Sequence, residues 1–381
     1  MSFGKYHWRH YFGGVALVLL VLQILTGVFL AFFYSPHLKE AYASVQYLYN
    51  HFPPGAWMRD GHRWIAFFML VTVIVHSIRS LLRRDFQRHG AVLWVTGSLF
   101  LPVLLAFLAT GFILPWEWRA YWFMEMIPNA FGYLPVIGPA VQSFLIEVFT
   151  LNRTLVAHVV VLPLLTFILL EYHVFAKTHK RTGGVWRYLR QHALLAIPFL
   201  VAVVVLVVQI PMPTQDPEII PMPLEGAFIP TAEWFLLIFW VPFFHFSKGM
   251  APWVGLVLPL LVFLLLTGLP FYFRGRGAAV RAGEMERGEE GAEQPGVVRA
   301  AGWGRRAAGF SAVVVTVTLL FGSLSVATYR SPTLGCNSCH NISMGERMGI
   351  PPAAFKDRNI VPLLADDAWM TKHWFIPTHV W

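Results

Sequence analysis

The sequence predicts an all-α integral membrane protein with about seven transmembrane helices and a small extracytoplasmic segment after the last helix. Hydrophobic residues make up 56% of the chain and charged residues only 13%, a composition typical of proteins that lie in a bilayer. Seven apolar runs are long enough to cross a hydrocarbon layer about 30 Å thick. These runs cover residues 11–33, 63–82, 91–114, 155–176, 192–210, 251–273 and 307–328.

Basic residues predict how the chain is oriented, because loops rich in lysine and arginine stay on the cytoplasmic side. The second and fourth connections are basic, with Arg83, Arg84, Lys177 and Lys180 among their residues, whereas acidic residues prevail in the third and fifth. We therefore expect a cytoplasmic N-terminus and an extracytoplasmic C-terminus. The inner loops explain the net charge of +9, so no nucleic-acid partner is implied.

The second and fourth helices each carry two histidines, His62 with His76 and His158 with His173. Thirteen residues lie between the first two and fourteen between the second two, so each pair spans roughly 21 to 23 Å of helix. Ionisable groups at membrane depth are costly and usually functional, and neutral imidazole is a standard axial ligand of haem iron. One such histidine alone would more often be a hydrogen-bonded core residue, but four at matched depth predict two haems clamped between the helices.

The first and third helices carry glycines with a similar spacing. Gly13 and Gly27 are fourteen residues apart, as are Gly97 and Gly111. A glycine inside a helix is unfavourable by about 1 kcal/mol relative to alanine, but it lets a flat group approach the backbone. Close helix packing through small residues would explain single glycines. The repeated spacing instead indicates that both helices press on haems at two depths.

The only two cysteines of the chain lie near its C-terminus, in Cys336-Asn-Ser-Cys339-His340. A C-x-x-C-H sequence is the attachment signature of c-type haem, in which two thioethers hold the porphyrin and the histidine ligates iron. A zinc half-site would need two more ligands, and a thioredoxin-like redox pair would need a βαβ setting. Covalent attachment occurs on the outer side of bacterial membranes, which agrees with the predicted orientation and indicates a bacterial cytoplasmic membrane.

The second axial ligand of this haem c stays open among Met370, His373 and His379, with Met370 favoured. Met344 lies only one helical turn from His340 and would stay on the same side of the ring. Only 41 residues follow His340, fewer than an independent cytochrome c fold uses, so we expect a partner to complete this segment.

From about Tyr6 to Phe273 the chain resembles cytochrome b of the quinol-oxidising bc and bf complexes. The motifs that carry the resemblance occur in the order and at the spacing of that family: Gln23-Ile-Leu-Thr-Gly27, Ala41-Tyr-Ala-Ser-Val45, Arg59-Asp-Gly-His62-Arg-Trp, Gly111-Phe-Ile-Leu-Pro-Trp116 and Thr150-Leu-Asn-Arg153. The spacing of the histidines in the fourth helix is more similar to the photosynthetic bf branch. That branch binds an extra haem through a cysteine just before the glycine pair of the first helix, where this chain has Tyr11-Phe12-Gly13-Gly14, so the extra haem is not expected.

This resemblance implies that the first four helices, within residues 1–190, form a dihaem cytochrome b bundle. It assigns His62 and His158 to an outer haem b and His76 and His173 to an inner haem b. Topology gives the same pairing, because the second and fourth helices both run from outside to inside.

Two further site roles follow from the resemblance. Arg59 and Arg153 resemble the arginines that bind haem propionates, although anchoring at the membrane interface would also explain them. Glu233, in Ala232-Glu233-Trp234-Phe235, corresponds to the family's Pro-Glu-Trp-Tyr and resembles its proton acceptor for quinol, since a partly buried glutamate can have a raised pKa. A solvated loop glutamate is the other explanation.

The rest of the chain divides into four parts. Residues 191–273 hold the C-terminal part of cytochrome b with the quinol-site loop, and residues 274–306 form a charged cytoplasmic linker. The seventh helix follows at 307–328, and residues 329–381 form the extracytoplasmic haem c segment.

The sequence thus predicts the membrane subunit of a proton-translocating quinol:cytochrome c oxidoreductase with two b haems, one c haem and a quinol substrate. One electron would leave through a Rieske iron–sulfur partner and haem c toward a further c-type cytochrome, while the other crosses through the b haems. The family implies a homodimer. Two alternatives are a non-bifurcating dihaem quinol dehydrogenase subunit that feeds a multihaem partner, and a transporter whose histidines relay protons.

Overall fold

The computed structural model describes residues 11–88, 90–117, 120, 127–128, 130–148, 150–176, 184–212, 239, 242 and 250–273. Within these ranges the regular structure is helical throughout, as the sequence predicts. The predicted helix at 307–328, the quinol-site residue Glu233 and the whole haem c segment, with Cys336, Cys339, His340 and Met370, lie outside the described residues.

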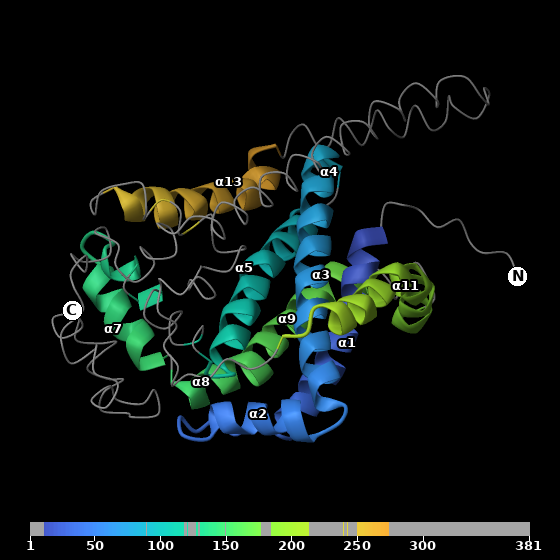
Figure 1. Ribbon diagram of the computed structural model, residues 1–381. Coiled ribbons are helices and arrows are strands. Elements are labelled where there is room, and N and C mark those ends of the chain that lie inside the picture. Colours follow the sequence, from blue (N-terminus) through green and yellow to red (C-terminus); the bar gives the residue numbers. More distant parts are fainter. Residues whose placement is uncertain are drawn as a thin grey trace, which may run out of the picture.

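Figure 1 shows the helices in order along the chain. They are α1 (Tyr11–Ala31), α2 (Ala41–His51), α3 (Gly55–Leu82), α4 (Asp85–Arg88), α5 (Ala91–Ile113), α7 (Gly138–Val148), α8 (Leu151–Val156), η2 (Ala157–Val161), α9 (Leu162–Leu170), η3 (Glu171–Phe175), α11 (Val185–Gln209), η5 (Trp253–Val257) and α13 (Leu258–Tyr272). The η segments are single π-helical turns, and α8 to η3 form one continuous helix, Leu151–Phe175.

Six described helices are long and apolar enough to cross a membrane: α1, α3, α5, Leu151–Phe175, α11 and Trp253–Tyr272. They coincide with six of the seven predicted runs. Three of them begin earlier than their apolar runs, α3 at Gly55, Leu151–Phe175 at Leu151 and α11 at Val185, because a helix can continue past the hydrocarbon boundary with polar residues in its first turns. In α3 those turns contain Arg59 and Asp60, which are buried together.

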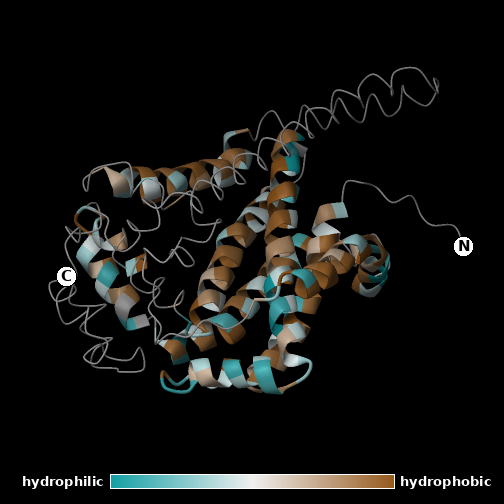
Figure 2. Cartoon of the chain, viewed as in Figure 1, coloured by the Kyte–Doolittle hydropathy of each residue, from teal (hydrophilic) through white to brown (hydrophobic). Residues whose placement is uncertain are grey.

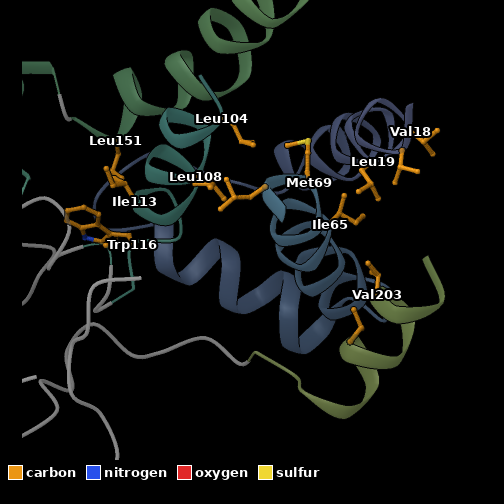
Figure 3. Close-up of a cluster of buried hydrophobic side chains, with 14 of the residues drawn as sticks. Val18, Leu19, Ile65, Met69, Leu104, Leu108, Ile113, Trp116, Leu151 and Val203 are labelled. Carbon is orange, nitrogen blue, oxygen red and sulfur yellow. The ribbon is translucent and has the colours of Figure 1, made fainter. Parts of the chain in front are cut away.

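The bundle is built from two helix pairs. α1 packs along α3, α5 packs along Leu151–Phe175, and α3 and α5 meet between them, while α11 covers α1 and α3. Figure 3 shows apolar side chains filling these contacts, among them Leu19, Ile65, Met69 and Leu108. In lipid, where apolar side chains gain little by leaving the solvent, close packing of this kind holds helices together.

Large apolar side chains also point away from the bundle. Leu164 and Phe167 on α9 and Val204 on α11 are each at least half exposed. Helix α13 carries further exposed apolar side chains. Figure 2 shows hydrophobic residues along these helices and hydrophilic ones gathered on α2 and the adjoining end of α3. So much exposed apolar surface is unfavourable in water but suits a multi-pass membrane protein.

The short helix α2 lies across one end of the bundle (Figure 1). Its buried residues, Ala41, Val45 and Leu48, recur at the spacing of one helical face and pack it against the start of α3. The first turns of α3, which lead to His62, are therefore covered.

Candidate functional site

Two pairs of histidines face each other between α3 and the helix Leu151–Phe175. In the first pair, His62 and His158, the ring centroids are 6.4 Å apart, and in the second pair, His76 and His173, they are 6.3 Å apart. Two imidazoles bound to opposite faces of one metal ion, each at about 2 Å from nitrogen to metal, have their centroids on the order of 6 Å apart. Both pairs therefore have the separation of two axial ligands on one iron.

Hydrogen bonds hold two of these rings in the form that binds metal. The Gln23 side-chain amide nitrogen lies 3.0 Å from His62 Nε2, and because an amide nitrogen only donates, Nε2 accepts and the ring proton is on Nδ1. His173 Nδ1 lies 3.0 Å from the Leu93 carbonyl oxygen, which only accepts, so Nδ1 carries the proton there too. A neutral ring with an unprotonated Nε2 is the ligating form, and a metal bound to His62 would take the place of the Gln23 donor at Nε2.

The four glycines singled out by their spacing each face one of the four histidines. A Cβ atom on Gly27 would lie 3.2 Å from His62 Cε1, and the nearest imidazole atoms would lie 3.1 Å from Gly111, 3.2 Å from Gly13 and 2.6 Å from Gly97. Their histidines are His158, His76 and His173, respectively. At these glycines the backbones of α1 and α5 thus lie close to both histidine pairs.

The two π-helical turns contain His158 and His173, one each. The step from His158 to His173 is one residue longer than the step from His62 to His76 on α3. A π turn accommodates one more residue than an α turn, and such turns occur frequently at functional sites. The wider turns therefore absorb the extra residue, so that both histidines of this helix meet their partners on α3.

A buried charged cluster, Arg59, Asp60 and Glu117, lies one turn from His62. The Arg59 guanidinium donates to the Glu117 carboxylate and to the Met212 carbonyl, and lies 3.4 Å from the Asp60 carboxylate. Arg59 is only 4% exposed, and its Nε has no hydrogen-bond acceptor among the residues that the structure describes. A buried N–H without an acceptor is costly, so this atom indicates a place for an anionic or polar group that the described residues do not supply.

Tyr49 connects this charged cluster to α2. Its hydroxyl donates to the Asp60 carboxylate at 3.2 Å, and the Arg59 guanidinium lies 5.4 Å from the centre of its ring. Burial, and then the negative charge of Asp60, raise the pKa of the Tyr49 hydroxyl. Tyr49 therefore stays protonated and keeps donating at neutral pH.

Arg153 differs from Arg59 in its surroundings. It is exposed, its guanidinium donates to the Glu147 carbonyl, and its backbone N–H lies 3.4 Å from the Thr150 hydroxyl that caps α8. The two arginines with the same predicted role thus occupy one buried and one exposed position.

A further histidine, the buried His192 on α11, was not singled out in the sequence. Its ring lies against Gly14, where a Cβ would overlap it, and its Nδ1 lies 2.9 Å from the Tyr188 carbonyl oxygen. The glycine doublet Gly13-Gly14 was the available signal, because its two members face different helices, one toward His76 and the other toward His192. Asp60 and Glu117 were also missed as partners of Arg59.

Comparison with known proteins covers the part of the chain that holds both histidine pairs. The family model described as Cytochrome b/b6/petB matches residues 4–181. Cytochrome b6 of Tupiella akineta is 34% identical over 166 residues, which are 42% of this chain and 77% of that relative. The chain belongs to the cytochrome b/b6 family. Cytochrome b6 of Mastigocladus laminosus is 33% identical over 172 residues, 43% of this chain and 80% of that protein.

This cytochrome b also has the fold of a solved structure titled "Hyperthermophilic respiratory Complex III". That match has a TM-score of 0.53 and 19% identity, and it covers 91% of this chain and 94% of that one. The chain is thus a membrane-spanning cytochrome b of electron transport, and its family implies b-type haems.

Proposed function

We propose that this cytochrome b is the membrane subunit of a quinol:cytochrome c oxidoreductase, and that the first and second histidine pairs are the axial ligands of two b haems. The observation that carries this proposal is the separation of the paired rings, 6.4 and 6.3 Å between centroids. Haem, when bound, supplies a one-electron carrier at each of two depths in the membrane.

The surrounding residues fit a haem at each depth. The four glycines keep the backbone of α1 and α5 free of side chains where the rings lie, and Gln23 and Leu93 favour the ligating tautomer of His62 and His173. The Nε of Arg59, which no described residue pairs, would donate to a propionate beside the first pair, for which a planar guanidinium is well suited. Arg153 would reach a propionate from the exposed edge.

The orientation of the chain, and the route of electrons, are part of the same proposal. The first pair would be the outer haem site, near a quinol site at Glu233, and the second pair the inner one. Glu233 would accept a proton as quinol is oxidised. Electrons would leave through a Rieske iron–sulfur protein and the haem c held by Cys336, Cys339 and His340, toward a further c-type cytochrome, with the complex forming a homodimer in a bacterial cytoplasmic membrane.

Haem counting in the purified complex tests the ligand assignment. Pyridine haemochrome spectra should give b and c haem in a ratio of about two to one. His62→Leu should remove only the outer b haem and His76→Leu only the inner one. His192→Leu is the matched control, because it removes a buried histidine of the same bundle that belongs to neither pair, and it should keep both b haems. Retention of both b haems in His62→Leu or His76→Leu would refute the assignment.

Subunit identification and one variant test the quinol chemistry. Glu233→Gln should leave both b-haem spectra unchanged and slow quinol oxidation by about 10- to 1,000-fold, since it removes a positioned base. Unchanged turnover at saturating quinol would rule out this role. A purified complex that oxidises quinol without any Rieske protein would favour the non-bifurcating alternative.

A further inference from the structure

Threonine precedes three of the four glycines that face the paired histidines. The dipeptides are Thr26-Gly27, Thr96-Gly97 and Thr110-Gly111, whereas Phe12 precedes Gly13. In each dipeptide the glycine meets an imidazole ring, and the threonine hydroxyl reaches Nδ1 of that same ring. The distance from hydroxyl oxygen to Nδ1 is 2.9 Å for Thr26 and His62, 2.8 Å for Thr110 and His158, and 3.4 Å for Thr96 and His173.

The direction of the hydrogen bonds in the first pair follows from proton counting. The Thr26 hydroxyl donates to the Leu22 carbonyl at 2.8 Å, and the Thr110 hydroxyl donates to the Ala106 carbonyl at 2.7 Å. A hydroxyl has one proton, so its remaining bond to the ring must be an accepted one. His62 and His158 therefore donate from Nδ1, which leaves Nε2 unprotonated in both rings.

A second contact independently indicates the same tautomer of His62, with the proton on Nδ1. The Gln23 amide nitrogen, which can only donate, lies at its Nε2. Both contacts thus indicate the same tautomer of His62, and iron bound at Nε2 would take the place of the Gln23 contact, while the Thr26 contact at Nδ1 would stay.

The second pair is held differently. His173 Nδ1 lies nearer the Leu93 carbonyl, at 3.0 Å, than the Thr96 hydroxyl, at 3.4 Å. The residue at the corresponding position before Gly13 is Phe12, which has no hydroxyl. His62 and His158 are also hydrogen-bonded to the backbone of Gln23 and Phe107, respectively. In the first pair a threonine hydroxyl therefore lies within 3 Å of Nδ1 beside a backbone partner, whereas at His173 the backbone carbonyl is the nearer acceptor.

We propose that Thr26 and Thr110 are positioning residues that fix the tautomer of His62 and His158 and tune the reduction potential of the haem bound between them. A hydrogen bond accepted from Nδ1–H makes an imidazole a more basic ligand, and such outer contacts are worth about 10- to 100-fold in metal affinity or activity. A more basic ligand stabilises the oxidised iron, so the two hydroxyls lower the potential of this haem. The proposal rests on the haem ligation proposed above.

The test replaces each hydroxyl by a methyl of the same shape. Thr26→Val, Thr110→Val and the double variant are compared with Thr26→Ser and Thr110→Ser, which keep the hydroxyl. The matched control is Thr72→Val, because Thr72 is a buried threonine of α3 whose hydroxyl also donates to a carbonyl of its own helix, that of Met69 at 2.9 Å. Both b haems are followed in the purified complex by optical redox titration and low-temperature EPR.

In the double valine variant the outer haem should titrate at higher potential, by about a tenfold change in its oxidised-to-reduced ratio, or about 59 mV for a one-electron couple. Its EPR signal should shift, the inner haem should not change, and the serine variants should behave like the original protein. Loss of the outer haem alone, restored by serine, would support the proposal in the same way.

Three results would overturn it. They are a full haem content with an unmoved outer potential, an equal shift of both haems, and loss of the inner haem together with the outer one. Each is distinct from a failure of the ligation proposal, which appears instead as retained haem in His62→Leu or His76→Leu.

Discussion

Among single residues, the glycines matter to the site as much as the histidines, because they have no side chain where the imidazole rings lie. Each of the four glycines lies where even one methyl group would crowd an imidazole, and Gly97 is the tightest, with its Cβ position 2.6 Å from His173 Cε1. Contacts below 3.0 Å between a Cβ and a ring atom require the ring to move. A ring that moves takes its Nε2 with it, so we expect these glycines to control the ligand geometry.

Gly97→Ala should therefore displace His173 and weaken or remove the inner haem, while the outer haem stays. Gly61→Ala is the matched control, because Gly61 also lies inside a helix but nothing is within 4 Å of its Cβ position; it should keep both haems and gain up to about 1 kcal/mol of helix stability. Haem content and the spectrum of each b haem measure the effect. An intact inner haem in Gly97→Ala would contradict the prediction.

The charged cluster gives a second prediction at this scale. Arg59→Met leaves Asp60 and Glu117 buried without their cation, and breaking a buried ion pair in this way destabilises a protein by about 3–5 kcal/mol. Arg153→Met is the control, because exposed charges contribute about 0–1 kcal/mol. Thermal unfolding of the detergent-solubilised complex should separate the two variants clearly. Equal stability of both would show that the Arg59 cluster is not a stabilising ion pair.

At the scale of elements, hydropathy predicted the spanning helices but not their polar extensions. The first turns of α3 were left out of the apolar run because they contain Arg59 and Asp60, which are polar in the sequence and paired in the structure. The helix α2 was not predicted, since its buried face is short and lies between turns. The π turns were not predicted either, although the extra residue between His158 and His173 is a sequence signal for them.

These π turns predict an unequal response to single deletions. Deleting Leu164, an exposed residue of α9, makes the step from His158 to His173 equal to that on α3, and a π turn can revert to α-helix. Both b haems should be retained, at about two per chain. Deleting Ile74 from α3, which has no π turn between its histidines, rotates His76 by one residue and should leave about one b haem. The haem-to-protein ratio of each deletion variant measures the effect. Loss of a haem in the α9 deletion would contradict this explanation of the π turns.

For the molecule as a whole, the sequence predicted the histidine pairs but not every contact between distant residues. The family resemblance and the direction of the helices were enough to expect His62 opposite His158 and His76 opposite His173, and the glycine spacing predicted close approach at the same two depths. The Arg59–Glu117 pair and the Gly14–His192 contact join residues far apart in the chain on different helices. No spacing pattern in the sequence predicts either contact, because each depends on how the helices are arranged in three dimensions.

The C-terminal segment carries the last prediction, which concerns how electrons leave the molecule. If haem c is attached through Cys336 and Cys339 on the outer side, it should accept electrons from the outer quinol site and pass them to the external acceptor. The variant with both cysteines replaced by serine should lose covalent haem staining while its b haems remain reducible by quinol through the inner site. Electron delivery to a soluble c-type cytochrome should then fall sharply. Delivery at the normal rate would mean that the Rieske partner reaches the acceptor directly and that haem c lies off the main path.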